Sequence, residues 1–261
     1  MKDVKLFEFD AMEVCRLIRE NLSGLAPRTQ KNIQDTMRTA VKAAIEARVL
    51  PQDALLGWKT VRVPRQSRPV LDREGLRRLV EAAEGYKYGL VIRLLAVTGA
   101  RIGEILGLTW DRVDFKRNAI TIDRSVDVLK RELKDEPKTF NSRRTIILDE
   151  ETMQKLYEHK QRQAKEKGVV QLKKDSRLVF QSPSGKPLKY NAVLYEFKTA
   201  LKKAGLPEMR IHDIRHSVVA LLLSEGVPAI TVAALVGHDV ATTNEMYAEK
   251  VKVTRAIDLK E

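Results

Sequence analysis

Three stretches late in the chain decide its fold: Ile-His-Asp-Ile-Arg-His-Ser at residues 211–217, Leu-Val-Gly-His at 235–238 and Thr-Thr-Asn-Glu-Met-Tyr at 242–247. His212 and Arg215 are three residues apart, so a helix places both on one face, where they can address one cluster of ligand oxygens. His238 follows a glycine that is expected to end a helix, and Tyr247 lies nine residues beyond it. An arginine fork binds an anion, an imidazole can move protons and a phenol can attack, so these groups suit chemistry on a phosphate.

The composition is that of a basic, globular protein. Apolar residues make up 43% of the 261 residues, which is compatible with a core in one large domain, or in an ordinary domain plus a small one. The net charge of +13 favours a polyanionic partner, with nucleic acid as the first candidate and an acidic membrane surface as the second. No apolar run approaches the roughly 20 residues of a spanning helix, and the N-terminus lacks the apolar core of a signal peptide. Cys15 is the only cysteine, so no disulfide forms within the chain, and a reducing cytoplasm fits.

Two helices are expected near the N-terminus, over residues 11–22 and 27–49, where apolar residues recur at helical spacing. The second helix has a basic side, made of Arg28, Lys31, Arg38 and Lys42. That side either faces solvent, as on many surface helices, or faces phosphate.

A basic connection follows the two helices. Residues 57–68 lose the periodicity and carry four cations and no acid: Lys59, Arg62, Arg65 and Arg68. This composition predicts a linker that lies along DNA. It divides the chain into a helical DNA-binding domain with its linker over residues 1–66 and a larger domain over residues 67–261.

The larger domain is predicted to be mainly helical, with a small sheet. Asp72 is expected to cap a helix, and residues 88–98 are apolar on all sides, which is typical of a core helix that Gly99 then ends. Strand patterns and later helices follow: strands at 113–115, 119–123, 144–148 and 178–180, and helices at 149–168, 190–204, 213–224 and 230–236. A long, mobile, charged turn is expected over residues 129–141. The predicted fold class is mainly α with a small antiparallel β-sheet (α+β).

Three further motifs resemble those of a known family. They are Thr-Gly-Ala-Arg-Ile-Gly-Glu at 98–104, Leu-Gly-Leu-Thr-Trp-Asp-Arg-Val-Asp at 106–114, and Pro-Lys-Thr at 137–139 with Ser142 and Arg144 after it. Together with the three stretches above, they resemble the boxes of the tyrosine recombinases, the phage-integrase family, in the same order and spacing. The resemblance covers essentially all of residues 67–261, and the helices before it resemble a short or truncated core-binding domain.

The resemblance implies a role for each matching residue. Arg101 and Arg215 neutralise the charge of a five-coordinate phosphorus, with Glu104 holding Arg101 from behind. The other implied roles are a proton acceptor at His212, a general acid at Lys138, a donor to the scissile phosphate at His238 and a nucleophile at Tyr247. The spacing of Arg101 and Glu104 also fits an ordinary helical ion pair, and a lysine in a charged turn is often only a solvated charge.

His212 and His216 are four residues apart, a spacing that can bind a metal on one helix face. No glutamate lies between them as in the metalloprotease pattern, and no cysteine or third histidine lies nearby. The sequence therefore favours no metal, with His216 as a buried, hydrogen-bonded neighbour.

The function implied by the resemblance is site-specific recombination of double-stranded DNA, for integration or excision of a phage or mobile element. It proceeds through a 3′-phosphotyrosine without metal or nucleotide cofactor, because the covalent link keeps the energy of the phosphodiester. The family further implies a two-domain clamp around DNA, a homo-tetramer on paired sites, accessory DNA-bending or directionality proteins and no membrane. A prokaryotic or phage-encoded protein of the cytoplasm, associated with the nucleoid, is expected, and no segment matches the family's arm-binding domain.

Two alternatives come from other classes of protein. A type IB topoisomerase uses a similar set of residues but needs neither a partner protomer nor a second site. A DNA-binding regulator needs the basic surface alone, and the chain carries the chemical groups in addition.

Overall fold

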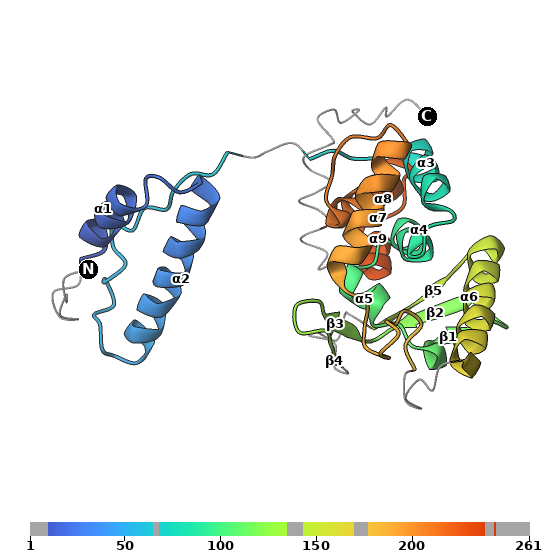
Figure 1. Ribbon diagram of the computed structural model, residues 1–261. Helices are drawn as coiled ribbons and strands as arrows, with labels where there is room; N and C mark the ends of the chain where they lie inside the picture. Colours follow the sequence, from blue (N-terminus) through green and yellow to red (C-terminus); the bar gives the residue numbers. More distant parts are fainter. Residues whose placement is uncertain (1–9, 65–67, 135–142, 170–176, 238–242, 244–261) are drawn as a thin grey trace, which may run out of the picture. The chain divides into compact units, whose positions relative to one another are not determined.

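The computed structural model describes residues 10–64, 68–134, 143–169, 177–237 and 243, and for residues 166–169 it describes the backbone alone (Figure 1). The chain divides into two compact units, Met1–Ser67 and Arg68–Glu261. In the described parts of the chain, no helix is both long and apolar enough to cross a membrane.

The first unit pairs α1 (Ala11–Asn21) with α2 (Pro27–Glu46). Asp10 begins α1, because its carboxylate accepts a hydrogen bond from the backbone N–H of Met12 at 2.8 Å. A small core of Val41, Leu50 and Ala54 closes the unit, with Trp58 packed against it.

Part of the expected linker belongs to this first unit. Gln34 is buried on α2, and its amide holds the backbone on both sides of Thr60: it donates to the carbonyl of Lys59 at 3.5 Å and accepts from Val61 N–H at 2.7 Å. The first residues of the stretch predicted as a linker are therefore attached to α2. A buried glutamine needs partners for both ends of its amide, and this stretch of backbone supplies them.

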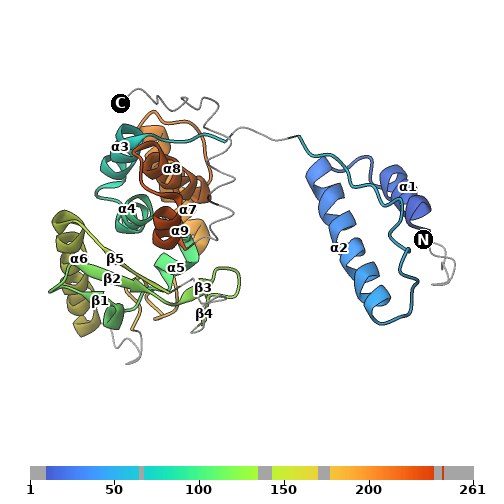
Figure 2. The ribbon, with the colours of Figure 1, turned by 180° about the vertical axis from the view of Figure 1, so that it is seen from behind.

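The second unit is built from helices around a central one. They are α3 (Arg73–Ala83), α4 (Gly89–Thr98), α5 (Ile102–Leu106), a 3₁₀ turn at Trp110–Arg112, α6 (Glu150–Val169), α7 (Tyr190–Lys203), α8 (Ile211–Ser224) and α9 (Ala229–Val236). α4 contacts α3, α5, α6, α7 and α8, and both views show it among them (Figures 1 and 2). Its Val91, Ile92 and Leu94 are fully buried, as expected of a helix that is apolar on all sides.

A small antiparallel sheet lies beside α6 in both views (Figures 1 and 2). Its strands are β1 (Val113–Asp114), β2 (Ala119–Ile122) and β5 (Arg144–Ile147), in the order β1-β2-β5. Ile120 pairs with Ile146, and both side chains enter the core. The predicted fold class, mainly α with a small antiparallel sheet, is confirmed.

A second, two-stranded sheet is a feature that the sequence did not predict. β3 (Ser125–Asp127) pairs with β4 (Glu132–Lys134), so the described start of the expected charged turn is a hairpin. Asp127 stabilises it, accepting from the backbone N–H of Leu129 at 3.1 Å and lying 3.0 Å from the Lys134 ammonium. The expected strand at 178–180 is reduced to a single bridge between Leu178 and Thr109.

Candidate active site

The site is built around the turn that ends α4. Gly99 has φ 61°, a left-handed conformation that ends the helix and favours glycine. Space also excludes a side chain, because a Cβ on Gly99 would lie 3.0 Å from Val236 Cγ1 and 3.1 Å from Val218 Cγ1. The turn therefore lies tightly against α8 and α9, and the residues that follow it leave α4 at a fixed point.

Arg215 reaches this turn from the first turns of α8. Its side chain is among the largest fully buried ones of the chain, at 1% exposure, and its Nη1 donates to the carbonyl of Gly99 at 2.8 Å. Burial and the positive charge of Arg101 lower the pKa of Arg215 to about 9, against the opposing effect of Glu104, so the group stays charged at neutral pH.

Arg101 leaves the same turn and opens α5. Its side chain is 44% exposed, while that of Glu104 is only 7% exposed. Arg101 Nη1 donates to Glu104 Oε1 at 2.9 Å, and Arg101 Nη2 donates to the carbonyl of Gly237 at 3.1 Å. The contact expected between Glu104 and Arg101 is present, and because the acid is buried it differs from a surface ion pair.

Arg144 is a residue to which the sequence assigned no task, although it lies in the Pro-Lys-Thr motif region. It is 8% exposed on β5, and its Nη2 donates to the second oxygen of Glu104 at 2.7 Å. Burial alone would raise the pKa of Glu104, but the hydrogen bond and charge of Arg144, with contributions from Arg101, lower it below its usual value. Glu104 therefore joins two arginines as a carboxylate.

His216 and Arg68 form a contact at the start of the larger unit. Arg68 Nη1 lies 2.8 Å from His216 Nε2, and the backbone N–H of Leu71 donates to Ser217 Oγ at 3.0 Å. A guanidinium can only donate, so His216 Nε2 is the acceptor and the neutral ring carries its proton on Nδ1. Burial and then the charge of Arg68 lower the pKa of His216 in agreement with this. Arg68, which the sequence predicted as a linker residue on DNA, is exposed and places its guanidinium against α8.

His212 stands one helical turn before His216, and the two rings meet edge to face with centroids 5.1 Å apart. One side of His212 is exposed, but protein on the other side desolvates its charged form, and His216, Arg215 and Arg101 add positive charge. These effects lower the pKa of His212 to about 4, so the imidazole is neutral at pH 7 and can accept a proton. Throughout the described residues, no group of three or more His, Cys, Asp or Glu side chains is arranged to hold a metal ion.

Several predicted site residues lie outside the described residues: Lys138, His238, Tyr247 and Arg65. The structure brings together Arg101, Glu104, His212 and Arg215 on the α4–α5 turn and the start of α8. Gly237 ends α9 at φ 71° and directly precedes His238 in the sequence.

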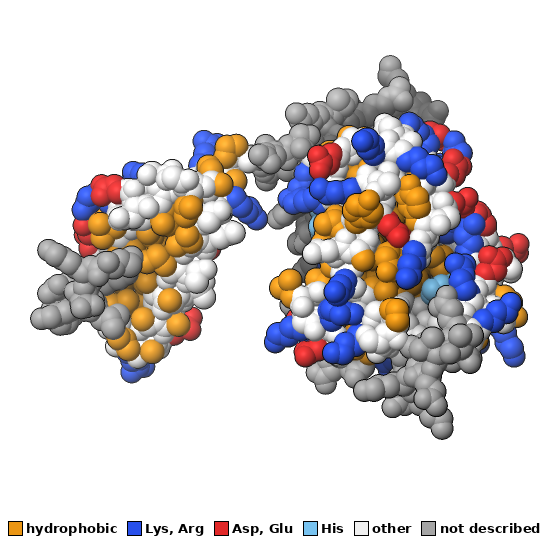
Figure 3. All heavy atoms as spheres, in the orientation of Figure 1, with side chains coloured by type: hydrophobic (Ala, Val, Ile, Leu, Met, Phe, Trp, Pro, Cys, Tyr) orange, Lys and Arg blue, Asp and Glu red, His pale blue; other side chains and the backbone are white. Residues whose placement is uncertain are grey.

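The predicted DNA-contacting residues of the first unit lie at its surface. Arg28, Arg38 and Lys42 are exposed on α2, and Lys59 and Arg62 are exposed beyond it. Lys31 is partly buried and its ammonium lies 2.8 Å from Asp35 Oδ2, so its charge is locally balanced. On the face of the larger unit that Figure 3 shows, Lys and Arg side chains are spread among Asp and Glu.

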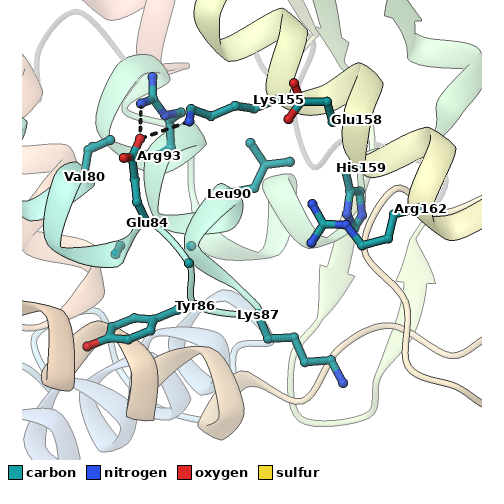
Figure 4. A pocket seen from close by; sticks show the side chains of 13 residues that line it. Val80, Glu84, Tyr86, Lys87, Leu90, Arg93, Lys155, Glu158, His159 and Arg162 are labelled. Carbon is teal, nitrogen blue, oxygen red and sulfur yellow. Dashed lines mark hydrogen bonds and ion pairs between the residues drawn. The ribbon is translucent and has the colours of Figure 1, made fainter.

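A hollow of about 370 Å³ in the larger unit lies between the α3–α4 turn and α6 (Figure 4). Glu84, which lines the hollow, forms ion pairs with Arg93 and Lys155, with its Oε1 at 3.0 Å from Arg93 Nη2 and from Lys155 Nζ. The residues that line it include none of those that the sequence analysis assigned to phosphate chemistry.

Comparison with known proteins gives relatives that match most of this chain. A tyrosine recombinase XerC-like protein of Caldanaerobacter subterraneus subsp. tengcongensis is 27% identical over 87% of this chain and 64% of its own length. An integrase of Streptomyces ambofaciens is 31% identical over 95% of this chain and 66% of its own length. The chain thus spans slightly less than two thirds of these relatives.

Solved structures share the fold. A Tn1549 transposon integrase in complex with transposon right end DNA superposes with a TM-score of 0.73, at 22% identity, over 95% of this chain and 82% of that one. A lambda integrase dimer bound to a COC′ core site gives a TM-score of 0.65, at 17% identity, over 100% of this chain and 87% of that one.

The family model described as "Phage integrase family" matches residues 69–253. That range contains the turn that ends α4, the arginines Arg101, Arg144 and Arg215, and Glu104, which lies between Arg101 and Arg144. It agrees with the family resemblance that the sequence motifs indicated. This chain belongs to the phage integrase family.

Proposed function

We propose that this chain cleaves and rejoins double-stranded DNA as a tyrosine-type site-specific recombinase, for integration or excision of a phage or mobile element. The observation that carries the proposal is the pair of charged arginines at the Gly99 turn: Arg215 is buried there, and Arg101 is half exposed. Glu104 is a single negative charge among three arginines, Arg101, Arg144 and Arg215, so a bound anion would stabilise them further. A five-coordinate phosphorus with its extra negative charge is the species they suit best.

The reaction follows from the groups that the sequence places around these arginines. The Tyr247 oxygen attacks the phosphorus, a bond forms to the 3′ phosphate, and the bond to the 5′ oxygen breaks. His212 accepts the phenol proton, Lys138 protonates the leaving 5′ oxygen and His238 donates to the phosphate. Rejoining is the reverse with another 5′ hydroxyl, and no cofactor is needed because the phosphotyrosine keeps the bond energy.

The assembly proposed for this activity follows the family and its neighbours. The first unit acts as a small DNA-binding domain, and the two units together bind a core site. Support comes from two structural neighbours, a Tn1549 transposon integrase in complex with transposon right end DNA and a lambda integrase dimer bound to a COC′ core site. A homo-tetramer on paired sites, accessory DNA-bending or directionality proteins, and a place in the cytoplasm near the nucleoid belong to the same proposal.

A joining assay tests this function against the topoisomerase alternative. The substrate is a plasmid that carries two sites from the flanks of the encoding element, and its control is the same plasmid without the sites. A recombinase joins the two sites and leaves the control untouched. Relaxation of both supercoiled plasmids without joining would identify a topoisomerase and refute site-specific recombination.

The basic side of α2 is expected to contact phosphates. We expect replacement of Arg28, Arg38 and Lys42 by glutamine to lower the logarithmic salt slope of duplex binding by roughly 0.9 for each lost contact. Binding to unrelated duplexes should weaken as well, because phosphate contacts carry no sequence information. Filter binding between low and moderate salt measures the slope.

Lys31→Gln serves as the matched control on the same helix, since Asp35 already balances that charge. It should change the slope less than any of the three exposed replacements. An unchanged slope in the triple variant would show that this side of α2 faces solvent.

A further inference from the structure

We infer that Arg144 is a positioning residue for the reaction, holding Glu104, and through it Arg101, against the end of α9. This inference rests on the proposed function for its activity measurements. Arg144 acts through the groups around it, Glu104 and the end of α9.

The contacts of Arg144 join three elements that are distant in sequence. Its Nη2 donates to Glu104 Oε2 on α5 at 2.7 Å, and its Nε donates to the carbonyl of Leu235 on α9 at 2.6 Å. A Cβ on Gly237 would lie 2.8 Å from Arg144 Nη1, so the guanidinium also lies against the turn that ends α9. Only a planar fork with donors in several directions can make these contacts at once.

Glu104 transmits the position of Arg144 to Arg101. One of its oxygens accepts from Arg144, and the other accepts from Arg101 Nη1 at 2.9 Å. Its Oε2 also accepts from the backbone N–H of Arg101 at 2.9 Å, which fixes both ends of that residue. Arg101 in turn donates to the carbonyl of Gly237, so the contacts close into a ring.

This ring of contacts fixes the positions of Arg101 and Gly237 relative to each other. Arg101 is one of the two arginines proposed to bind the phosphate, and Gly237 is the last described residue before His238 in the sequence. Since β5 carries Arg144, the ring also ties the sheet to α5 and α9. A displacement of about 1 Å in such a frame can cost about 100-fold in rate.

The charges around Glu104 predict how its pKa would change if Arg144 were replaced. The groups facing that carboxylate are Arg144 from β5, Arg101 from the α4–α5 turn and Arg215 from α8. Without Arg144 the buried carboxylate keeps fewer positive neighbours, so its pKa rises relative to the unmodified protein. Protonation at acidic pH then weakens its hold on Arg101.

The test compares Arg144→Lys and Arg144→Ala with Arg93→Lys in the full chain, in single-turnover cleavage of a nicked substrate between pH 5 and 9. Arg93 is a matched control, because it is also 8% exposed and paired with acids, Glu84 and Glu151, outside the site. We expect Arg144→Lys, which keeps the charge but loses the planar fork, to bind DNA normally but cleave roughly 100-fold more slowly. In Arg144→Ala, which loses the charge as well, the rate should fall further toward low pH, whereas Arg93→Lys should keep the unmodified rate per folded molecule and the unmodified pH profile.

A second readout does not depend on activity. When folding lowers the pKa of a carboxyl group, the group stabilises the folded state at pH values above its pKa in the unfolded chain. This stability is lost as the pH falls through its pKa in the folded state. In Arg144→Ala the loss on acidification should therefore begin at higher pH than in the unmodified chain. Equal cleavage profiles for Arg144→Lys and Arg93→Lys, with a working unmodified enzyme, would overturn the positioning role. Failure of the unmodified chain to cleave would instead refute the proposed function.

Discussion

Tyr247→Phe is expected to bind the target duplex as the unmodified chain does and to form no covalent adduct with it. The unmodified chain should form a protein–DNA adduct that survives detergent, with the DNA 3′ phosphate on a peptide that contains Tyr247. The effect is all or none, because removing the phenol oxygen removes the atom that makes the bond.

The substrate for this experiment is a nicked suicide duplex. After cleavage it loses the short 5′ fragment, so no 5′ hydroxyl remains to reverse the reaction and the intermediate accumulates. An ordinary phenol has a pKa near 10 and attacks poorly, so the charged Arg101 and Arg215 and the neutral His212 are what make the attack feasible. Denaturing gel electrophoresis shows the adduct, and mass spectrometry of the digested adduct locates it.

Two tyrosines of α7 provide matched controls. Tyr190 and Tyr195 lie on a described helix, and Tyr195 is exposed, so Phe replacements there should leave adduct formation unchanged. An adduct on either of them, or full activity in Tyr247→Phe, would show that the nucleophile is wrongly assigned.

Arg215→Lys is expected to fold and bind DNA while its cleavage rate falls by about 10³-fold or more. Lysine keeps a charge and one donor for the carbonyl of Gly99, which Arg215 now contacts at 2.8 Å. It cannot supply the planar fork that a charged, expanding phosphate requires. The loss should appear in the rate of cleavage at saturating DNA and not in the affinity, because the interaction strengthens in the transition state.

Arg210→Lys is the control on the same helix. Arg210 is exposed and pairs with Asp213 at 2.8 Å, a contact that lysine can largely retain. Thermal melting of both variants separates chemistry from folding. A large fall in melting temperature for Arg215→Lys, with a proportionate loss of DNA binding, would instead indicate a structural ion-pair role for Arg215.

Much of the site follows from local rules that the sequence obeys. Gly99 and Gly237 end helices because glycine alone takes the left-handed conformation without strain, and both have positive φ. The spacing of His212 and Arg215 places them on one side of a helix whatever that helix packs against. Most of α4 must be buried, since nearly all of its side chains are apolar.

Other features depend on residues that are far apart in the chain. The hairpin β3–β4 lies in a charged stretch whose local pattern resembles a turn. Gly103 on α5 lets β3 pack closely against that helix, since a Cβ on Gly103 would lie 2.7 Å from the carbonyl oxygen of Val126. Gln34 binds backbone at residues 59–61, so a stretch with linker composition becomes part of a folded unit.

The sequence by itself determined the family, the fold class and the helical placement of His212 and Arg215, because these depend on motifs, periodicity and backbone conformations that neighbouring residues set. Only the tertiary structure decided what the remaining cations do. Arg68 meets His216 across 148 positions, and Arg144 meets Glu104 across 40. An arginine looks the same in a sequence whether it faces solvent, DNA or a buried carboxylate. The partner is chosen by packing, since a charge removed from water must find an opposite charge or an acceptor that the fold brings to it.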